Sequence, residues 1–170
     1  MIIAETSRLI ISEFAITDAP FYFELLNTPK WIKYIGDRHV KTIAEAKAYL
    51  LEKTIPAYNK QGFGFYKLTN KETQKPIGTA GLICREKLQH PDIGFALLPE
   101  YESKGFGHEA SIKILDLAQN KFNLKRVLGI TIEHNLASIK LLEKLGLHFE
   151  KKVKPFEDDK ELLLFAKDLS

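Results

Sequence analysis

Apolar and β-branched residues occur along the chain in short segments separated by glycine, proline or polar clusters. Segments of this length and composition are typical of β-strands. The pattern predicts about seven strands, at residues 8–14, 64–68, 76–84, 92–98, 126–132, 147–154 and 161–168. The polar segment 70–75 lies between two of these strands and predicts a hairpin turn.

Elsewhere apolar residues recur every three or four positions, which predicts about four helices. These helices run from Thr17 or Asp18 up to Pro29, from 42 to about 58, from 109 to 122 and from 135 to 146. Thr42 and Glu45 form a capping box, Asn135 is a good N-cap, and Gly146 is a good helix terminator. Residues 31–36 are aromatic and end on glycine, so we expect an irregular loop or a short helix there.

The order of these elements predicts an α/β fold of the α+β type. One strand, two helices and three strands are followed by a helix, a strand, a helix and two strands, and short links in the middle favour antiparallel pairing. We therefore expect a mixed, mostly antiparallel sheet with helices on its faces, in a single domain over residues 1–170. Gly78 and Gly81 lie inside one predicted strand and indicate a bulge or a close approach of other backbone.

Composition narrows the functional class. Apolar residues make up 45% and charged residues 28% of the chain, as in ordinary soluble proteins. The net charge of +3 gives little support for a protein that binds nucleic acid or a membrane surface. Cys84 is the only cysteine, which excludes an intrachain disulfide and a cysteine zinc site; we expect it to be a small core residue in a cytoplasmic protein. The N-terminus lacks signal-peptide features, and no apolar run approaches the ~18–20 residues that span a bilayer.

Residues 97–110 combine the end of a strand, a turn, two glycines and the start of a helix. The first amides of a helix have no intrahelical partner, and glycines let a ligand approach this backbone closely. Gly105 and Gly107, with Lys104 beside them, therefore suit the binding of a phosphate group. The alternative is an ordinary turn between a strand and a helix.

Two segments in this order resemble the GNAT N-acetyltransferases. Residues 93–110 are similar to the acetyl-CoA loop of that family, and residues 135–146 are similar to its second cofactor motif. The start, Glu5-Thr6-Ser7-Arg8-Leu9, resembles the opening strand of the RimJ/RimL-like branch, which contains the ribosomal-protein N-terminal acetyltransferases.

This resemblance implies that acetyl-CoA is the co-substrate, that no metal takes part, and that an amine attacks the thioester directly in a ternary complex. It implies that strands 92–98 and 126–132 splay apart and that pantetheine lies between them. The residues implied to contact the cofactor are Ala96, Leu97 and Leu98 for pantetheine, Lys104, Gly105, Phe106, Gly107 and His108 for the pyrophosphate, and Asn135 and Ser138 for the arm or the leaving thiol. The alternative for Asn135 is a plain helix cap, and for Ser138 a first-turn residue without a ligand.

The sequence departs from the family pattern at two positions. Glu102 stands where Gln or Arg is common, and would place a negative charge near the pyrophosphate unless it turns to solvent. Leu142 stands at the position of the tyrosine that many members of the family use as general acid, and leucine cannot donate a proton. The thiolate must therefore be protonated by Ser138 or a water, or leave as a stabilised thiolate. As general base we expect Asp92: in the branch that the chain resembles, an acidic residue often stands two positions before the glycine of this strand, and Asp92 stands two before Gly94. The alternatives are a strand-edge role for Asp92 and His90 as the base.

The acceptor site is expected in the first third of the chain. The candidates are Trp31, Tyr34, Gly36, Asp37 and Arg38: an aromatic wall with one acid can hold an ammonium group, and the Arg38 guanidinium can hold a carboxylate or phosphate. The alternative is that Trp31 and Tyr34 are core residues. The acceptor is either a protein N-terminal α-amine, which is slightly favoured, or a small amine. No His, Asp and Glu constellation has metal-ligand spacing.

The sequence leaves other readings open. The protein is expected to be a monomer or a homodimer. A non-catalytic acyl-CoA-binding module is the alternative function, and it predicts cofactor binding without turnover. A nucleic-acid-binding domain is a third class, and it predicts binding that weakens with salt.

Overall fold

The centre of the molecule is a single sheet. The computed structural model describes residues 1–156, 158 and 160–169, and within them the sheet has eight strands in the order β1-β2-β3-β4-β5-β6-β8-β7. The strands are β1 (Ile2–Glu5), β2 (Leu9–Ser12), β3 (Phe65–Asn70), β4 (Pro76–Ile83), β5 (Asp92–Leu97), β6 (Arg126–Thr131), β7 (His148–Val153) and β8 (Leu162–Asp168). All neighbours pair antiparallel except β5 and β6, which are parallel, so the predicted mixed sheet is confirmed.

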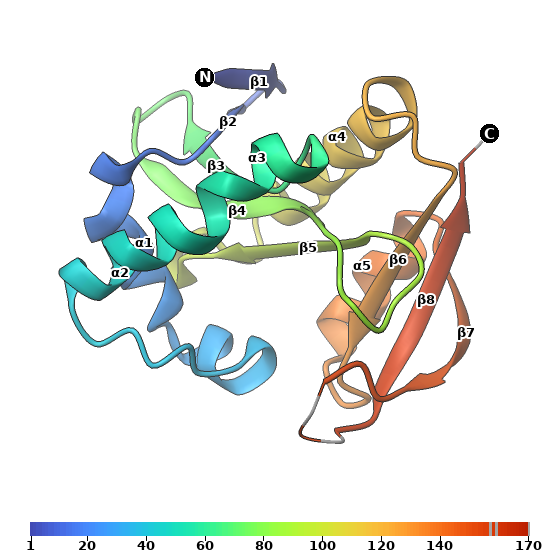
Figure 1. Ribbon diagram of the computed structural model, residues 1–170. Coiled ribbons are helices and arrows are strands. Elements are labelled where there is room, and N and C mark those ends of the chain that lie inside the picture. The colour runs from blue at the N-terminus through green and yellow to red at the C-terminus, as the bar shows by residue number, and fades with distance from the viewer. Residues whose placement is uncertain (157, 159, 170) are drawn as a thin grey trace.

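Helices cover both faces of this sheet. They are α1 (Ala19–Leu26), α2 (Ile43–Tyr49), α3 (Ile55–Gln61), α4 (Phe106–Asn120) and α5 (Leu136–Lys144). Four shorter helical segments accompany them: the 3₁₀ segments η1 (Ile16–Asp18) and η4 (Pro99–Tyr101), and the π-helical segments η2 (Trp31–Ile35) and η3 (Leu50–Thr54). Figure 1 shows α1, α2 and α3 in front of the sheet and α4 and α5 behind it. In the described part of the chain, no helix has the length and hydropathy needed to cross a membrane.

The two largest of three clusters of buried side chains in the described residues hold these layers together. The larger contains sheet residues such as Leu82 with Ile114 of α4. The smaller contains Leu25 of α1, Trp31 of η2 and Leu50 of η3. The second cluster supports the N-terminal segments as a wall in front of β4 and β5.

Three element predictions need correction. The prediction of about seven strands missed β1, whose Ile2 is exposed and whose pairing with β2 supplies an edge strand. The helix predicted at 42–58 is divided by the wide turn η3 and continues to Gln61, where Gly62 adopts a left-handed φ of 87°. Helix α4 begins at Phe106, three residues before the expected start at 109.

Other local predictions are confirmed. The Thr42 hydroxyl accepts a hydrogen bond from the Glu45 amide at 3.0 Å, as a capping residue does. Gly146 has a left-handed φ of 92° after α5. A Cβ atom on Gly78 would lie 2.3 Å from the Ala96 carbonyl oxygen, so that strand does require close backbone approach. Cys84 is exposed just after β4, so the expectation of a core residue was wrong.

Candidate active site

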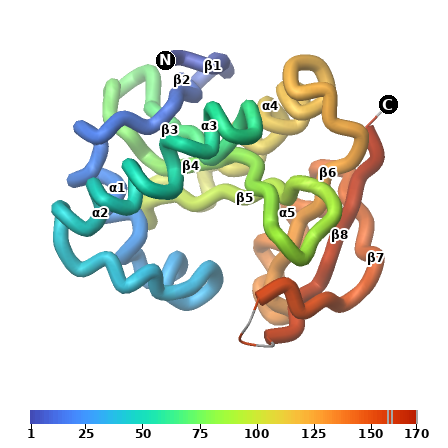
Figure 2. Tube along the Cα trace, viewed as in Figure 1, coloured from blue at the N-terminus to red at the C-terminus, as the bar shows by residue number. Residues whose placement is uncertain are grey.

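The sheet opens between β5 and β6. The two strands share a single paired position, Asp92 with Leu128, and the Leu128 amide donates to the Pro91 carbonyl at 2.9 Å. Beyond this point their paths diverge, as Figure 2 shows. The result is a gap that is closed at the start of β5 and widens toward its end.

Strand alternation decides which backbone groups of β5 face this gap. The Pro91 carbonyl points to β6, whereas the Leu98 amide donates to the carbonyl of Ile77 in β4 at 2.9 Å. Peptide groups two residues apart on a strand point the same way. Phe95 and Leu97 therefore present their amides and carbonyls to the gap, while Ala96 and Leu98 direct theirs to β4. Of the three residues expected to face pantetheine, only Leu97 has this orientation.

The glycine loop ends in the open N-terminus of α4. Gly105 has a left-handed φ of 83°, and the first helical bond runs from the Glu109 amide to the Gly105 carbonyl at 3.0 Å. The amides of Phe106, Gly107 and His108 precede this bond and have no intrahelical acceptor among the described residues. A Cβ on Gly107 would lie 2.9 Å from the Phe95 ring, so glycine lets α4 approach β5 closely. This arrangement suits an anion.

The N-terminal segment braces this loop. The Arg8 guanidinium donates to Glu109 at 2.7 Å and to the Lys104 carbonyl at 3.0 Å, and it lies 4.1 Å above the centre of the Phe106 ring. The Thr6 hydroxyl also donates to Glu109. Partial burial raises the pKa of Glu109, but these hydrogen bonds from Thr6 and Arg8 outweigh it, and the pKa is lowered. Residues 5–9 at the start of the chain therefore hold the glycine loop in place through Thr6 and Arg8, a structural role that was not predicted from the sequence.

Glu102 does not leave a free negative charge beside the loop. Its carboxylate forms an ion pair with Lys30, which lies just before η2. The partner is therefore a lysine rather than solvent. This neutralises the charge that made Glu102 a concern for phosphate binding.

A cavity of about 230 Å³ lies where the gap meets the N-terminal wall. It is lined by both expected catalytic residues, by Asn135 and by three of the five acceptor candidates, namely Asp92, Ser138, Asn135, Trp31, Tyr34 and Arg38. The other two candidates, Gly36 and Asp37, do not line it. The glycine-loop residues do not line it, since they lie at the start of α4. The Tyr34 ring lies 6.3 Å from the ring of His134, so the N-terminal wall contacts the segment before α5 at this site.

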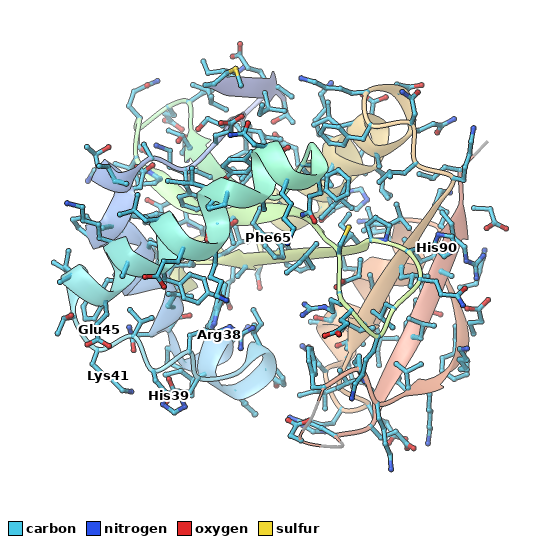
Figure 3. The ribbon with its side chains drawn as sticks, in the orientation of Figure 1. Arg38, His39, Lys41, Glu45, Phe65 and His90 are labelled. Carbon is cyan, nitrogen blue, oxygen red and sulfur yellow. The ribbon has the colours of Figure 1, made fainter. Side chains whose placement is uncertain are left out.

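Asp92 is buried at the closed end of the gap. It is 2% exposed, and its Oδ1 accepts a hydrogen bond from the Arg85 guanidinium at 2.9 Å. Burial raises the pKa of Asp92 to about 6, although Arg85 acts in the opposite direction. Asp92 is the first residue of β5, as the alternative interpretation has it, but β5 is an interior strand and the carboxyl is buried beside the cavity. His90 lies on the loop between β4 and β5 in Figure 3 and does not line the cavity.

The start of α5 combines capping with exposure to the cavity. The Asn135 Oδ1 accepts a hydrogen bond from the Ser138 amide at 3.3 Å, so Asn135 caps the helix. The Ser138 side chain is half-buried and lines the cavity. Leu142 also lines it and is 6% exposed, while a Cβ on Gly129 would lie 2.6 Å from its Cδ2. Leu142 therefore packs tightly against β6.

Several lining residues were missed from the sequence. They are Tyr22, Tyr49, Lys53, Arg85 and Ser111. Ser111 is fully buried, and its Oγ has no hydrogen-bond partner among the described residues. Ser111 could have been identified from the sequence, because it is a polar residue at a position where the helical pattern of α4 expects an apolar one. The other four residues lie far apart in the sequence and come together only in the folded chain.

Metal ligands are not grouped in the described residues: no cluster of three His, Cys, Asp or Glu side chains could hold an ion there. The groups that line the cavity are instead a buried carboxyl, hydroxyls, aromatic rings and basic side chains. Such a set can bind an organic substrate and move a proton.

Comparisons with known proteins agree with this architecture. Residues 8–148 match the model of the acetyltransferase (GNAT) domain family. The uncharacterized N-acetyltransferase YoaA of Bacillus subtilis is 26% identical over 149 residues, which cover 87% of this chain and 84% of YoaA. RimL, a ribosomal L7/L12 alpha-N-protein acetyltransferase solved with coenzyme A, aligns with a TM-score of 0.84 at 15% identity over 99% of this chain and 98% of its own. An acetyltransferase from Agrobacterium tumefaciens aligns with a TM-score of 0.80 at 20% identity, covering 96% and 92% of the two chains.

Proposed function

The chain belongs to the GNAT acetyltransferase family, and from this premise we propose that it transfers the acetyl group of acetyl-CoA to a primary amine in a ternary complex. The observation that carries this proposal is the buried Asp92 at the closed end of the gap between β5 and β6, beside a cavity that extends to the N-terminal wall. A proton acceptor and room for an acceptor molecule therefore lie together.

The pyrophosphate and the pantetheine arm of acetyl-CoA each have a complementary region in the proposed complex. The pyrophosphate would accept hydrogen bonds from the amides of Phe106, Gly107 and His108 at the start of α4. Pantetheine would lie in the gap and pair with the peptide groups of Phe95 and Leu97, like an added strand. RimL, which has the same fold, was solved with coenzyme A, and this supports the assignment.

In the proposed reaction, the Asp92 carboxylate takes a proton from the acceptor ammonium, directly or through a water. The neutral amine then attacks the thioester carbonyl, the new C–N bond forms and the C–S bond breaks. The second proton that the amine nitrogen loses passes to the leaving thiolate through the Ser138 hydroxyl or a water, because Leu142 has no proton to give. The pKa of Asp92, about 6, lies close to the range in which a general base is effective at neutral pH.

The first test is calorimetric titration with acetyl-CoA and then with CoA, followed by a screen of amines for release of the CoA thiol. We expect binding in the micromolar range and turnover of at least one amine. Absence of binding to both ligands would reject the proposal.

The alternative is a non-catalytic acyl-CoA-binding module, and Leu142 is the observation that favours it. A packed leucine removes a common proton donor from the site. This alternative predicts acetyl-CoA binding with no thiol release for any amine, so the same pair of assays separates the two functions.

A further inference from the structure

We propose that the acceptor is a primary amine that also carries a carboxylate, and that Arg38, Lys53 and the Trp31 indole N–H bind this carboxylate. The inference rests on the proposed function, because it names the substrate class of the same site. Figure 3 places Arg38 on the segment between η2 and α2, and Phe65 near the centre of the molecule beside β5.

The charges that line the cavity are mostly positive. Arg38, Lys53 and Arg85 are the basic lining residues, and Asp92 is the one acidic residue among the described residues that line it. Arg85 is already paired with Asp92. Arg38 and Lys53 form no ion pair with any side chain that the structure describes. Two cations therefore remain available for an anionic ligand group.

Trp31 supplies an independent sign of a ligand. Its side chain lines the cavity and the residue is 8% exposed, yet its Nε1 has no hydrogen-bond acceptor among the described residues. A buried N–H without an acceptor is costly, so such groups in proteins are usually satisfied by protein, water or ligand. A carboxylate oxygen bound in the cavity that Trp31 and Arg38 both line could satisfy it.

The phosphates of acetyl-CoA are not the expected partners of these cations. Arg38 precedes α2 and Lys53 lies in η3, both on the face of the sheet that α1, α2 and α3 cover. The open amides that suit the pyrophosphate belong to α4, on the opposite face. The two anion-binding regions are thus separate.

The arrangement also gives the acceptor a direction. Asp92 attracts the ammonium group at the closed end of the gap, and the two free cations attract the carboxylate at the N-terminal wall. The rings of Tyr22 and Tyr49, whose centres lie 5.9 Å apart, line the apolar part between the charged groups. A polyamine would place a second positive charge against this wall, which disfavours it.

The test uses Trp31 as its own probe, since it is the only tryptophan in the chain. Its fluorescence is followed during titration with the common L-amino acids, each compared with its uncharged α-amide, and with spermidine. Amidated peptides that begin with Glu or Gln form a second series, which distinguishes a free amino acid from a protein N-terminus. Each titration is made with and without CoA, and turnover is measured separately as thiol release from acetyl-CoA.

Two variants and one control test whether Arg38 and Lys53 bind the carboxylate. Arg38→Gln and Lys53→Gln should each weaken binding of the preferred carboxylate about tenfold or more and leave its amide little changed. Lys47→Gln is the matched control, because Lys47 is an exposed cation of α2 that does not line the cavity. It should bind as the unmodified protein does.

Binding of a carboxylate in preference to its amide, lost in Arg38→Gln but kept in Lys47→Gln, would support the inference. The inference is overturned if amides or spermidine bind as well as carboxylates, if no carboxylate changes the Trp31 fluorescence, or if Arg38→Gln leaves the preference intact. Selective carboxylate binding without thiol release from acetyl-CoA would support the carboxylate-binding site while rejecting the transferase function and, with it, the role of the ligand as acceptor, so the two failures are distinguishable.

Discussion

Replacing Asp92 with Asn should abolish the acid limb of the pH profile. Asp92 is buried with a pKa raised to about 6 from 3.8, so at pH 5 only about a tenth of the molecules carry the carboxylate that the proposed mechanism needs. We expect kcat/KM of the unmodified protein to rise about tenfold for each pH unit below 6 through this group, and less steeply above it. Asn has nearly the same shape and can accept the hydrogen bond from Arg85, but cannot take a proton.

The size of the effect follows from general base catalysis, which typically contributes 10²–10⁴-fold. We expect Asp92→Asn to lower kcat/KM by about that factor at pH 7. The loss should become smaller at high pH, where more of the amine is already neutral. Affinity for acetyl-CoA should change little, because Asp92 lies at the closed end of the gap, away from the start of α4.

The assay is thiol release over a pH series, with Asp116→Asn as the matched control. Asp116 is exposed on α4 and receives the same chemical change far from the cavity lining. Arg85→Met is informative in the other direction: it removes the group that lowers the pKa of Asp92, so the acid limb should move to higher pH. The assignment of Asp92 as the base is refuted if kcat/KM of Asp92→Asn stays within twofold of the unmodified protein and its pH profile keeps an acid limb near pH 6.

The same pKa shift predicts a change in stability with pH. A carboxyl whose pKa is raised on folding stabilises the folded state fully below its unfolded pKa, and this contribution is lost as the pH rises through the folded value. The shift from 3.8 to about 6 corresponds to about 3 kcal/mol. In urea unfolding, the free energy of unfolding of Asp92→Asn should therefore fall much less between pH 4 and pH 7 than that of the unmodified protein. An unchanged pH dependence of this free energy would contradict the raised pKa of Asp92.

Three further substitutions test the cofactor contacts. Gly107→Trp should prevent acetyl-CoA binding in calorimetry, because even a Cβ there lies 2.9 Å from the Phe95 ring; the folded state is checked by circular dichroism, and intact binding would remove the loop from the site. Glu109→Gln should weaken acetyl-CoA binding several-fold, as expected for a partly exposed ion pair with Arg8, and leave kcat unchanged; a fall in kcat alone would contradict a bracing role. Ser138→Ala should lower kcat with KM for acetyl-CoA little changed, and normal kinetics would leave Ser138 a structural residue.

The features predictable from the sequence are those set by neighbouring residues. Thr42 and Gly146 mark helix ends through their own backbone and side-chain chemistry, and the structure has both. The glycine loop is likewise local, since Gly105 needs a left-handed φ and Gly107 sits against a strand that directly precedes it. The residues next to each position were therefore sufficient to predict these helix ends and the glycine loop.

What the sequence could not predict depends on pairs that are far apart in the chain. Glu102 is neutralised by Lys30, 72 positions away, and Arg8 braces Glu109 across 101 positions. Neither pairing leaves a trace in local spacing. The orientation of Ala96 toward β4 likewise required the register with Thr79, because a shift of one residue reverses every peptide group along the strand.

The two departures from the family pattern, Glu102 and Leu142, affect the proposed reaction differently. Lys30 offsets the charge of Glu102, so that departure leaves the phosphate-binding amides unopposed. Leu142 does remove a proton donor, but a thiol with a pKa of about 8.5, the value for free cysteine, leaves as a thiolate far more readily than an amine does. An acceptor amine, by contrast, is mostly protonated at neutral pH and cannot attack until it loses that proton. The reaction therefore depends more on its base than on its acid, and Asp92→Asn should cost more in rate than Ser138→Ala.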